Sequence, residues 1–276
     1  MADNSAWFDT IVASYNSPPV SVSGYLLPGF PSDSLQISTT GHAGVDTLRE
    51  AFIFYEDCKH LFARLDHPLG QNSRLLDFGI GWGRVARFFL REIPLGNIWG
   101  IDVEPELVAI CKETFRSDQF QVTPAFPPSG LPDESFDFVV GYSVFSHLSG
   151  PACHAWMEEF YRITAPGAIV ALTTRGRPFF DYCESLKSED RSDYLNALAN
   201  MFADFDEARG RYDRGELVHS NFPGVTGGGA RTAQFYGETF IPEQYARTAF
   251  TDHFSLEEFL YEPGRQSHPI MFFRRR

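Results

Sequence analysis

The chain has 276 residues, which at roughly 150 residues per domain corresponds to one or two domains with room for a substantial core. Hydrophobic residues make up 43% and charged residues 21%, a composition that excludes a disordered or collagen-like chain. The 23 Lys and Arg residues against 36 Asp and Glu residues leave a formal net charge of −13, which disfavours a nucleic-acid partner because its phosphates are repelled.

The N-terminal segment, residues 1–41, is rich in Ser, Pro and Gly but also carries aromatic residues, so we expect it to lie along a surface of the protein. Over residues 45–65 apolar side chains recur at three- and four-residue steps, which predicts an amphipathic helix. We therefore predict an N-terminal lid segment and helix over 1–65, followed by the main domain over 66–276.

Short apolar runs then alternate with helical stretches, a pattern typical of βα units in a mainly parallel α/β sheet. Five strands are predicted, over residues 74–78, 97–103, 120–123, 136–143 and 168–173. The predicted helices of this region cover residues 84–91, 104–115 and 151–163.

The pattern changes after residue 175. Residues 177–235 combine a charged, helix-like part with a glycine-dense loop, and we interpret them as a helical and loop insertion that covers the substrate side of the sheet. The helix-like part carries one apolar stripe, made of Tyr194, Leu195, Leu198, Met201, Phe202 and Phe205. A helix over 242–250 and strands over 254–261 and 270–274 follow, and the two strands are predicted to complete a seven-stranded sheet as an antiparallel hairpin.

The most informative stretch is Leu-Asp-Phe-Gly-Ile-Gly-Trp-Gly at residues 76–83, where an apolar strand ends in an acid and enters a helix through alternating glycines. Glycine lets a ligand approach the main chain, and a helix N-terminus offers free N–H groups. The dinucleotide fingerprint G-x-G-x-x-G would need a glycine where Arg84 stands. Asp77 suits a ligand with an ammonium group better than one with a pyrophosphate, since a carboxylate repels phosphate. An NAD(P)-dependent oxidoreductase is kept as the alternative.

This stretch resembles the first motif of class I S-adenosylmethionine-dependent methyltransferases, and the whole layout resembles bacterial methyltransferase-domain proteins. Other stretches that are similar to the family are residues 99–103, 131–140, 142–148 and 165–170. The resemblance implies a Rossmann-like, doubly wound fold, with S-adenosylmethionine as the cofactor. The residues that it assigns to cofactor binding are Asp77, Gly79, Gly81, Trp82, Gly83, Asp102, Val103, Ala125, Phe126 and Ser143.

The resemblance also implies separate roles for these residues. Asp77 would organise the turn or contact the amino group of the cofactor, Asp102 would accept both ribose hydroxyls, and Val103 would flank the adenine. Many family members carry an acid or amide after the third strand of the sheet, but this chain reads Val-Thr-Pro-Ala-Phe at 122–126. Backbone groups near Ala125 or Phe126 would then have to contact the adenine.

For the acceptor side we select His147 as a general base, because imidazole titrates near neutral pH and the family resemblance puts its loop beside the reactive methyl. A base matters for a hydroxyl acceptor and hardly at all for an amine or a thiolate. A purely structural role for His147 is the alternative. Four aromatic residues are candidate substrate contacts, with a place in the core as the equal alternative: Tyr15, Tyr25, Phe145 and Tyr236.

Metal, membrane and disulfide chemistry are not expected. The sequence has no H-x-x-x-H or H-E-x-x-H spacing, and its four cysteines are too widely spaced for a zinc site, so we expect them to be buried. No apolar run approaches the roughly 18 residues of a membrane span, and the N-terminus lacks a secretory signal. We expect a cytoplasmic monomer or homodimer that methylates a small molecule, with an aromatic compound or a natural product as the candidate acceptor. Because a fold does not establish chemistry, a non-catalytic module that binds S-adenosylmethionine remains a further alternative.

Overall fold

The computed structural model describes residues 4–16, 20–22, 25–186 and 192–276. Seven strands form one sheet in the order β10-β11-β7-β6-β3-β4-β5, and two further sheets have two strands each, β1-β2 and β8-β9. Strand β3 runs parallel to β4 and β6, and β4 runs parallel to β5. Strand β11 is antiparallel to both β7 and β10. The prediction of a mainly parallel α/β sheet with a C-terminal antiparallel hairpin is therefore confirmed.

Contacts divide the chain into two compact units, each assembled from separate stretches of sequence. Unit 1 consists of Met1–Thr123, Phe136–Tyr142 and Pro263–Ser267, and unit 2 of Pro124–Ser135, Ser143–Glu262 and His268–Arg276. The predicted lid segment and helix over 1–65 fall within unit 1, and the predicted insertion over 177–235 falls within unit 2. Their roles as a lid and as a substrate cover stay predictions.

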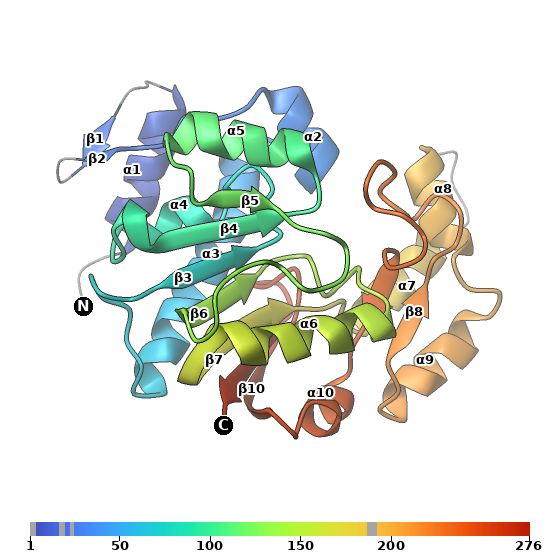
Figure 1. The fold of residues 1–276 in the computed structure, drawn as a ribbon. Coiled ribbons are helices and arrows are strands. Elements are labelled where there is room, and N and C mark those ends of the chain that lie inside the picture. The colour runs from blue at the N-terminus through green and yellow to red at the C-terminus, as the bar shows by residue number, and fades with distance from the viewer. Residues whose placement is uncertain (1–3, 17–19, 23–24, 187–191) are drawn as a thin grey trace. The chain divides into compact units, whose positions relative to one another are not determined.

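Unit 1 holds the first four strands of the parallel sheet with the helices that accompany them (Figure 1). Its helices are α1 (Asn4–Asn16), α2 (Asp33–Thr40), α3 (Val45–Arg64), α4 (Ala86–Phe89) and α5 (Pro105–Phe115), with a 3₁₀ turn η1 (Leu95–Asn97). Its strands are β1 (Ser21–Val22), β2 (Tyr25–Leu26), β3 (Leu75–Phe78), β4 (Ile98–Asp102), β5 (Phe120–Val122) and β6 (Phe136–Gly141).

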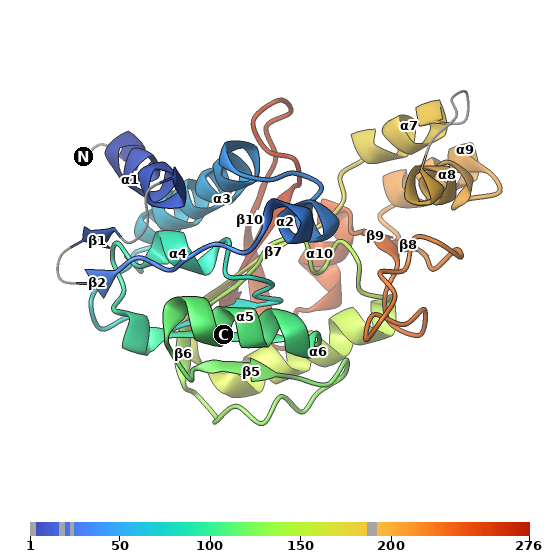
Figure 2. The same cartoon turned by 90° about the horizontal axis from the view of Figure 1, so that it is seen from above.

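Two helices of the N-terminal segment, α1 and α2, were not predicted. Helix α1 lies beside α3 (Figure 2), and the indole Nε1 of Trp7 donates a hydrogen bond to the Phe88 carbonyl at 2.9 Å. Helix α2 is capped by Ser32, whose hydroxyl accepts a hydrogen bond from the backbone N–H of Leu35, and it ends at Gly41 in the left-handed conformation. The helix predicted over 84–91 is shorter than expected: α4 covers Ala86–Phe89.

Unit 2 contains the antiparallel end of the large sheet and a group of short helices. Its helices are α6 (Gly150–Ile163), α7 (Pro178–Ser185), α8 (Asp193–Asn200), α9 (Phe205–Asp213) and α10 (Glu243–Ala249). Its strands are β7 (Thr164–Thr173), β8 (Val218–Ser220), β9 (Glu238–Phe240), β10 (Phe254–Leu260) and β11 (Ile270–Arg275).

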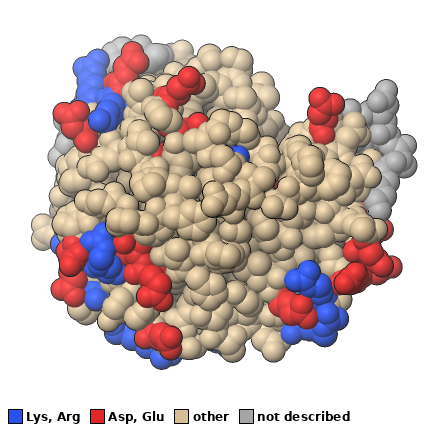
Figure 3. All heavy atoms as spheres, turned by 45° about the vertical axis from the view of Figure 1, so that its right-hand side comes forward, with Lys and Arg blue, Asp and Glu red and all other residues tan. Residues whose placement is uncertain are grey.

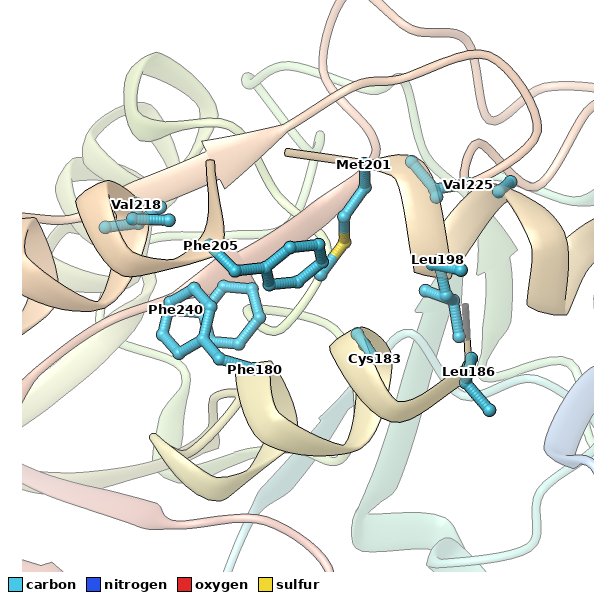
Figure 4. Packing of buried hydrophobic residues seen from close by; sticks show 12 residues of the cluster. Phe180, Cys183, Leu186, Leu198, Met201, Phe205, Val218, Val225 and Phe240 are labelled. Atoms are coloured by element: carbon cyan, nitrogen blue, oxygen red, sulfur yellow. The ribbon is translucent and has the colours of Figure 1, made fainter. Parts of the chain in front are cut away.

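Helices α7, α8 and α9 pack on a shared apolar cluster (Figure 4). At its centre the rings of Phe180 and Phe240 stack with their centroids 3.8 Å apart. The predicted apolar stripe is therefore correct for Leu198, Met201 and Phe205, which are buried in this cluster. It is wrong for Tyr194, which is 43% exposed and directs its hydroxyl to a carboxylate instead.

Three general properties of the chain can be read from the structure. All four cysteines are free and buried, as predicted. No helix in the described parts of the chain is both long and apolar enough to cross a lipid bilayer. On the face that Figure 3 shows, Lys and Arg side chains lie next to Asp and Glu side chains, so the acidic excess does not gather into one patch there.

Candidate functional site

The three glycines that follow β3 all require glycine's conformational freedom. Gly79, Gly81 and Gly83 have φ angles of +73°, +55° and +79°, in the left-handed region that other residues rarely adopt. A Cβ on Gly83 would come within 2.3 Å of the Phe115 ring, whereas a Cβ on Gly81 would meet nothing within 4 Å. Gly83 therefore allows α5 to pack against the turn, while open space lies beside the backbone at Gly81.

Asp102, at the end of β4, holds this turn in place. Its Oδ2 accepts a hydrogen bond from the Gly81 N–H at 2.8 Å, and its Oδ1 accepts one from the Glu104 N–H at 3.0 Å. The backbone N–H of Gly79 also donates to the Ile101 carbonyl at 2.8 Å. Because a carboxylate oxygen can accept more than one hydrogen bond, Asp102 keeps capacity for the ribose contact that the sequence predicts. Sequence reasoning missed its contact with the turn.

Asp77, the acid of β3 before the turn, is a buried carboxylate that no cation of the described residues contacts. It is 2% exposed, and its Oδ2 has no hydrogen-bond partner within the described parts of the chain. Burial and the nearby charge of Asp102 raise the pKa of Asp77 to about 7. A hydrogen bond from the Ala86 N–H and the charge of Arg84 act in the other direction and lower this pKa, but they do not offset the burial. An oxygen left unpaired in a buried position costs free energy unless a ligand satisfies it. The ammonium group of an amino-acid moiety fits that requirement.

Arg84 stands where the dinucleotide fingerprint has its third glycine, and it turns towards α3. Its guanidinium donates to the Thr47 hydroxyl at 2.8 Å and to Glu50 at 3.0 Å. It also lies over the Tyr142 ring, 5.0 Å from the centroid. The charge of Arg84 is thus matched by Glu50, which leaves the Asp77 carboxylate without this arginine as a direct partner.

A buried arginine links the glycine turn to the N-terminal segment. The Arg87 guanidinium lies 3.9 Å from the centroid of Phe30 and 4.9 Å from that of Trp82. It donates to the carbonyls of Gly29 and Gly83, each at 3.2 Å. Burial lowers the pKa of Arg87 to about 9. No motif pointed to this residue, because two of its partners, Gly29 and Phe30, lie more than fifty positions away.

The remaining candidates in unit 1 belong to the N-terminal segment and to β4. Tyr15 donates a hydrogen bond to Asp33 and packs edge-on against Phe30. Tyr25 pairs through its backbone with Val22, and its side chain lies outside the described part of the chain. Val103 directly follows β4 and is partly exposed.

In unit 2 the candidates divide between a loop and a polar cluster. The Ala125 carbonyl accepts a hydrogen bond from the Trp156 indole at 3.0 Å, and the Phe126 ring meets Phe235 edge-on. Phe145 is fully buried and stacks on Phe160, as a core residue would.

Ser143 is one of the few non-glycine residues with a positive φ, +60°, and its N–H donates to the Thr173 hydroxyl at 2.6 Å. Such a conformation persists only where the surroundings hold it. The Ser143 hydroxyl lies 3.4 Å from Nε2 of His147, so this turn brings a predicted cofactor residue and the predicted base together.

His147 is 8% exposed and is held on three sides. Its Nδ1 lies 2.8 Å from the Gly237 carbonyl oxygen and 3.4 Å from Oε1 of Glu238. The Tyr236 ring stacks on the imidazole with centroids 4.8 Å apart and an interplanar angle of 4°. Two predicted residues, His147 and Tyr236, are therefore in contact, although 89 positions in the chain separate them.

Glu238, which sequence reasoning missed, is the fully buried carboxylate beside His147. Arg175 donates from Nε to its Oε2 at 2.7 Å, and the Tyr194 hydroxyl donates to its Oε1 at 3.0 Å. Burial alone would raise the pKa of Glu238, but Arg175 and His147 together lower it to about 2. No local sequence signal marks Glu238, since its partners lie on α8, after β7 and in the loop after β6.

Known proteins with similar sequence or structure support one assignment. A family described as "Methyltransferase domain" matches residues 75–167. An uncharacterized methyltransferase of Schizosaccharomyces pombe is 28% identical over 111 residues, which are 36% of this chain and 39% of that protein. The chain therefore spans about two fifths of the length of this relative.

Two solved structures share the fold. The PH0226 protein of Pyrococcus horikoshii has a TM-score of 0.51 at 13% identity, covering 80% of this chain and 89% of that one. A putative methyltransferase from Haloferax volcanii, solved as a complex with the Trm112 methyltransferase activator, has a TM-score of 0.50 at 15% identity, covering 89% and 99%.

These findings, with the glycine turn and the strand order, define a class I S-adenosylmethionine-dependent methyltransferase domain. The matched region begins at β3 and includes the glycine turn and the two acids Asp77 and Asp102. Its cofactor is S-adenosylmethionine, and the predicted resemblance to class I S-adenosylmethionine-dependent methyltransferases is confirmed.

Proposed function

We propose that this protein transfers a methyl group from S-adenosylmethionine to a small-molecule acceptor, acting in the cytoplasm as a monomer or homodimer. The observation that carries the proposal is the unpartnered Oδ2 of Asp77 at the start of the glycine turn. S-adenosylmethionine, when bound, supplies a sulfonium methyl group and an ammonium group. Dinucleotides supply phosphates, which a carboxylate in this position repels.

The residues that would hold the cofactor lie around the turn. Asp77 would accept a hydrogen bond from the ammonium group, and the backbone at Gly79 and Gly81 would border the methionine moiety. Asp102 would accept hydrogen bonds from the ribose hydroxyls through its carboxylate, since each carboxylate oxygen can accept more than one hydrogen bond. Val103 would border the adenine.

On the acceptor side we propose His147 as the base and Tyr236 as a neighbouring wall. Both are held by contacts within unit 2, and the ring of His147 keeps an edge that no carbonyl occupies. An aromatic or natural-product acceptor is favoured over a nucleic acid because the chain carries a net charge of −13.

Calorimetric titration with S-adenosylmethionine and with NADH tests the cofactor assignment. We expect binding of the first alone, and we expect Asp102→Ala to weaken it by more than about tenfold because a charge-assisted contact is lost. The matched control is Asp118→Ala, since Asp118 is an exposed acid just before β5. Unchanged affinity in Asp102→Ala with an intact fold would remove Asp102 from the site.

Incubation with radiolabelled S-adenosylmethionine and a metabolite extract tests for catalysis. We expect a labelled small molecule and stoichiometric demethylated cofactor. Tight cofactor binding without any labelled product would instead favour the non-catalytic binding module.

A further inference from the structure

We propose that Glu238 is a positioning residue that prepares His147 to remove a proton, and that the acceptor is consequently a hydroxyl compound. This inference rests on the proposed methyl transfer and narrows its acceptor to one chemical class. It is carried by the contacts around His147, Glu238 and Arg175 in unit 2.

The hydrogen bonds of His147 determine which ring nitrogen is the basic one. A carbonyl oxygen can only accept, so Nδ1, at 2.8 Å from the Gly237 oxygen, carries the hydrogen in the neutral ring. The lone pair is then on Nε2. The group near Nε2 is the Ser143 hydroxyl, at 3.4 Å, which is a long contact that an incoming hydroxyl can replace. The ring is thus held in the tautomer that can accept a proton at Nε2.

Glu238 supplies the negative charge that a protonated ring needs. Its Oε1 lies 3.4 Å from Nδ1, on the side of the ring opposite to Nε2. A carboxylate at this distance stabilises the imidazolium that forms when Nε2 takes a proton. Because Glu238 is fully buried, water screens this interaction little.

The Glu238 carboxylate is held in place by two side chains, Arg175 and Tyr194. Arg175 binds its Oε2 at 2.7 Å and is itself 2.9 Å from Nε2 of His268. Tyr194 donates to its Oε1 at 3.0 Å. Arg175 keeps Glu238 ionised, and the two contacts together hold its carboxylate in place.

The other polar groups near the ring do not compete for this role. The hydroxyl of Thr239 donates its one hydrogen to the Leu148 carbonyl, so His219 donates from Nδ1 to that hydroxyl at 2.8 Å. The Arg231 guanidinium lies 5.8 Å from the centroid of the Tyr236 ring, which stacks on His147. Among the described residues, Glu238 is the carboxylate that the structure places against His147.

A base prepared in this way is useful for an acceptor that must lose a proton. In the reaction the acceptor oxygen forms a bond to the methyl carbon, and the bond from that carbon to sulfur breaks with its electron pair staying on sulfur. The hydroxyl proton goes to Nε2 of His147, and the product is a methyl ether. A neutral amine needs no base before attack, so this arrangement would give it no advantage.

Nitrogen NMR on histidine-labelled protein tests the pair directly. In the wild-type protein we expect the neutral His147 ring to carry its hydrogen on Nδ1. In Glu238→Gln we expect kcat for methyl transfer to fall by at least about tenfold with KM little changed, because the charge that stabilises the protonated ring is lost. A ring with its hydrogen on Nε2, or an unchanged kcat, would overturn the proposal. The tautomer is read in the wild type, so it decides the question even if Glu238→Gln does not fold.

The surface pair His253 and Glu158 is a matched control. Its atoms lie 2.8 Å apart, closer than those of the buried pair, but the two side chains are 28% and 66% exposed. Glu158→Gln should leave kcat and the tautomer of His147 unchanged, because solvent screens this exposed pair. Tyr194→Phe keeps the carboxylate and should leave kcat within about threefold of the wild type. A fall in kcat in Glu158→Gln as large as in Glu238→Gln would show that the readout is not local, and would remove its support for the pair.

The nature of the labelled product separates this inference from the proposed function. O-methylated products that form at least about tenfold more slowly in Glu238→Gln, through a lower kcat with KM little changed, would support both. N- or S-methylated products would leave the methyl transfer intact and overturn the choice of acceptor. Absence of S-adenosylmethionine binding would overturn the proposed function, whereas the NMR result would still decide how His147 and Glu238 interact.

Discussion

Asp77 in unit 1 and Glu238 in unit 2 are both buried carboxylates, 2% and 0% exposed, yet their environments act in opposite directions. Burial, together with the charge of Asp102, raises the pKa of Asp77 to about 7, whereas the cations around Glu238 lower its pKa to about 2. The difference is whether the protein supplies its own cation in contact. The charge of Glu238 is neutralised within the protein by Arg175. Asp77 has an oxygen without a hydrogen-bond partner among the described residues, which suits it to bind a cationic group of a ligand.

The largest expected effect is the loss of stability when Glu238 no longer neutralises Arg175. Glu238→Gln should lower the free energy of unfolding at pH 7 by about 3 to 5 kcal/mol, because Arg175 is left as a buried charge without its partner. Urea denaturation measures it. Asp77→Asn is the matched change at the other carboxylate, and it should not lower stability at pH 7, since it removes a buried charge that has no cation. Equal losses in the two variants would contradict the distinction.

The two carboxylates should also give stability opposite dependences on pH. The folded-state pKa of Asp77 is raised, so its contribution is fully present below about pH 4 and is lost as the pH rises through about 7. That of Glu238 is lowered, so its contribution is present above about pH 4.5 and is lost as the pH falls through about 2.

Comparison of the wild type with Asp77→Asn isolates the first of these contributions. Between pH 5 and pH 7 the wild type should lose about 2 kcal/mol of unfolding free energy relative to the variant. Urea denaturation at both pH values gives the difference, and Asp118→Asn, at an exposed acid, serves as the control. A difference that does not change with pH would mean that Asp77 is ionised throughout.

The contrast between the two carboxylates also explains what could be predicted from the sequence. The glycine turn, Asp77 and Asp102 follow from a short contiguous motif, because the turn's conformation needs glycine at fixed positions and the two acids end neighbouring strands. Glu238 could not be predicted, since its partner Arg175 lies 63 positions away and both belong to segments with no motif. Spacing along the chain says nothing about which buried charges will meet.

The same physical reason accounts for the other omissions. Arg87 looks like an ordinary charged residue of a short helix, and its place between Phe30 and Trp82 depends on how the N-terminal segment folds back. Helix α2 could have been found, since Ser32 and Gly41 are good cap residues at its two ends. The surrounding Pro and Ser residues hid that signal. Tyr194 was wrongly assigned to the apolar stripe because an aromatic ring satisfies an apolar pattern whatever its hydroxyl contacts.

Cofactor binding should depend on pH through Asp77. An ammonium group binds the ionised carboxylate, so the affinity for S-adenosylmethionine should rise about tenfold between pH 6 and pH 8 as a group with a pKa of about 7 ionises. Calorimetry in buffers of different ionisation enthalpy should detect the released proton at pH 6. Asp77→Asn should bind more weakly at pH 8 and show no such pH dependence. A tenfold rise that persists in Asp77→Asn would assign the titration to another group.

The smallest effect concerns the hydroxyl that binds Glu238. Tyr194→Phe removes one hydrogen bond to a carboxylate that Arg175 already neutralises, so the loss of unfolding free energy should be about 1 kcal/mol. Because Arg175 and His147 account for the lowered pKa of Glu238, this loss should be the same at pH 4 and pH 7. Tyr182→Phe on α7, an exposed tyrosine that stacks on Phe179, is the control and should change stability by less than about 0.5 kcal/mol. A loss in Tyr194→Phe that grows between pH 4 and pH 7 would mean that the tyrosine, and not the arginine, keeps the carboxylate ionised, and the contrast with Asp77 would then rest on a hydrogen bond instead of a cation.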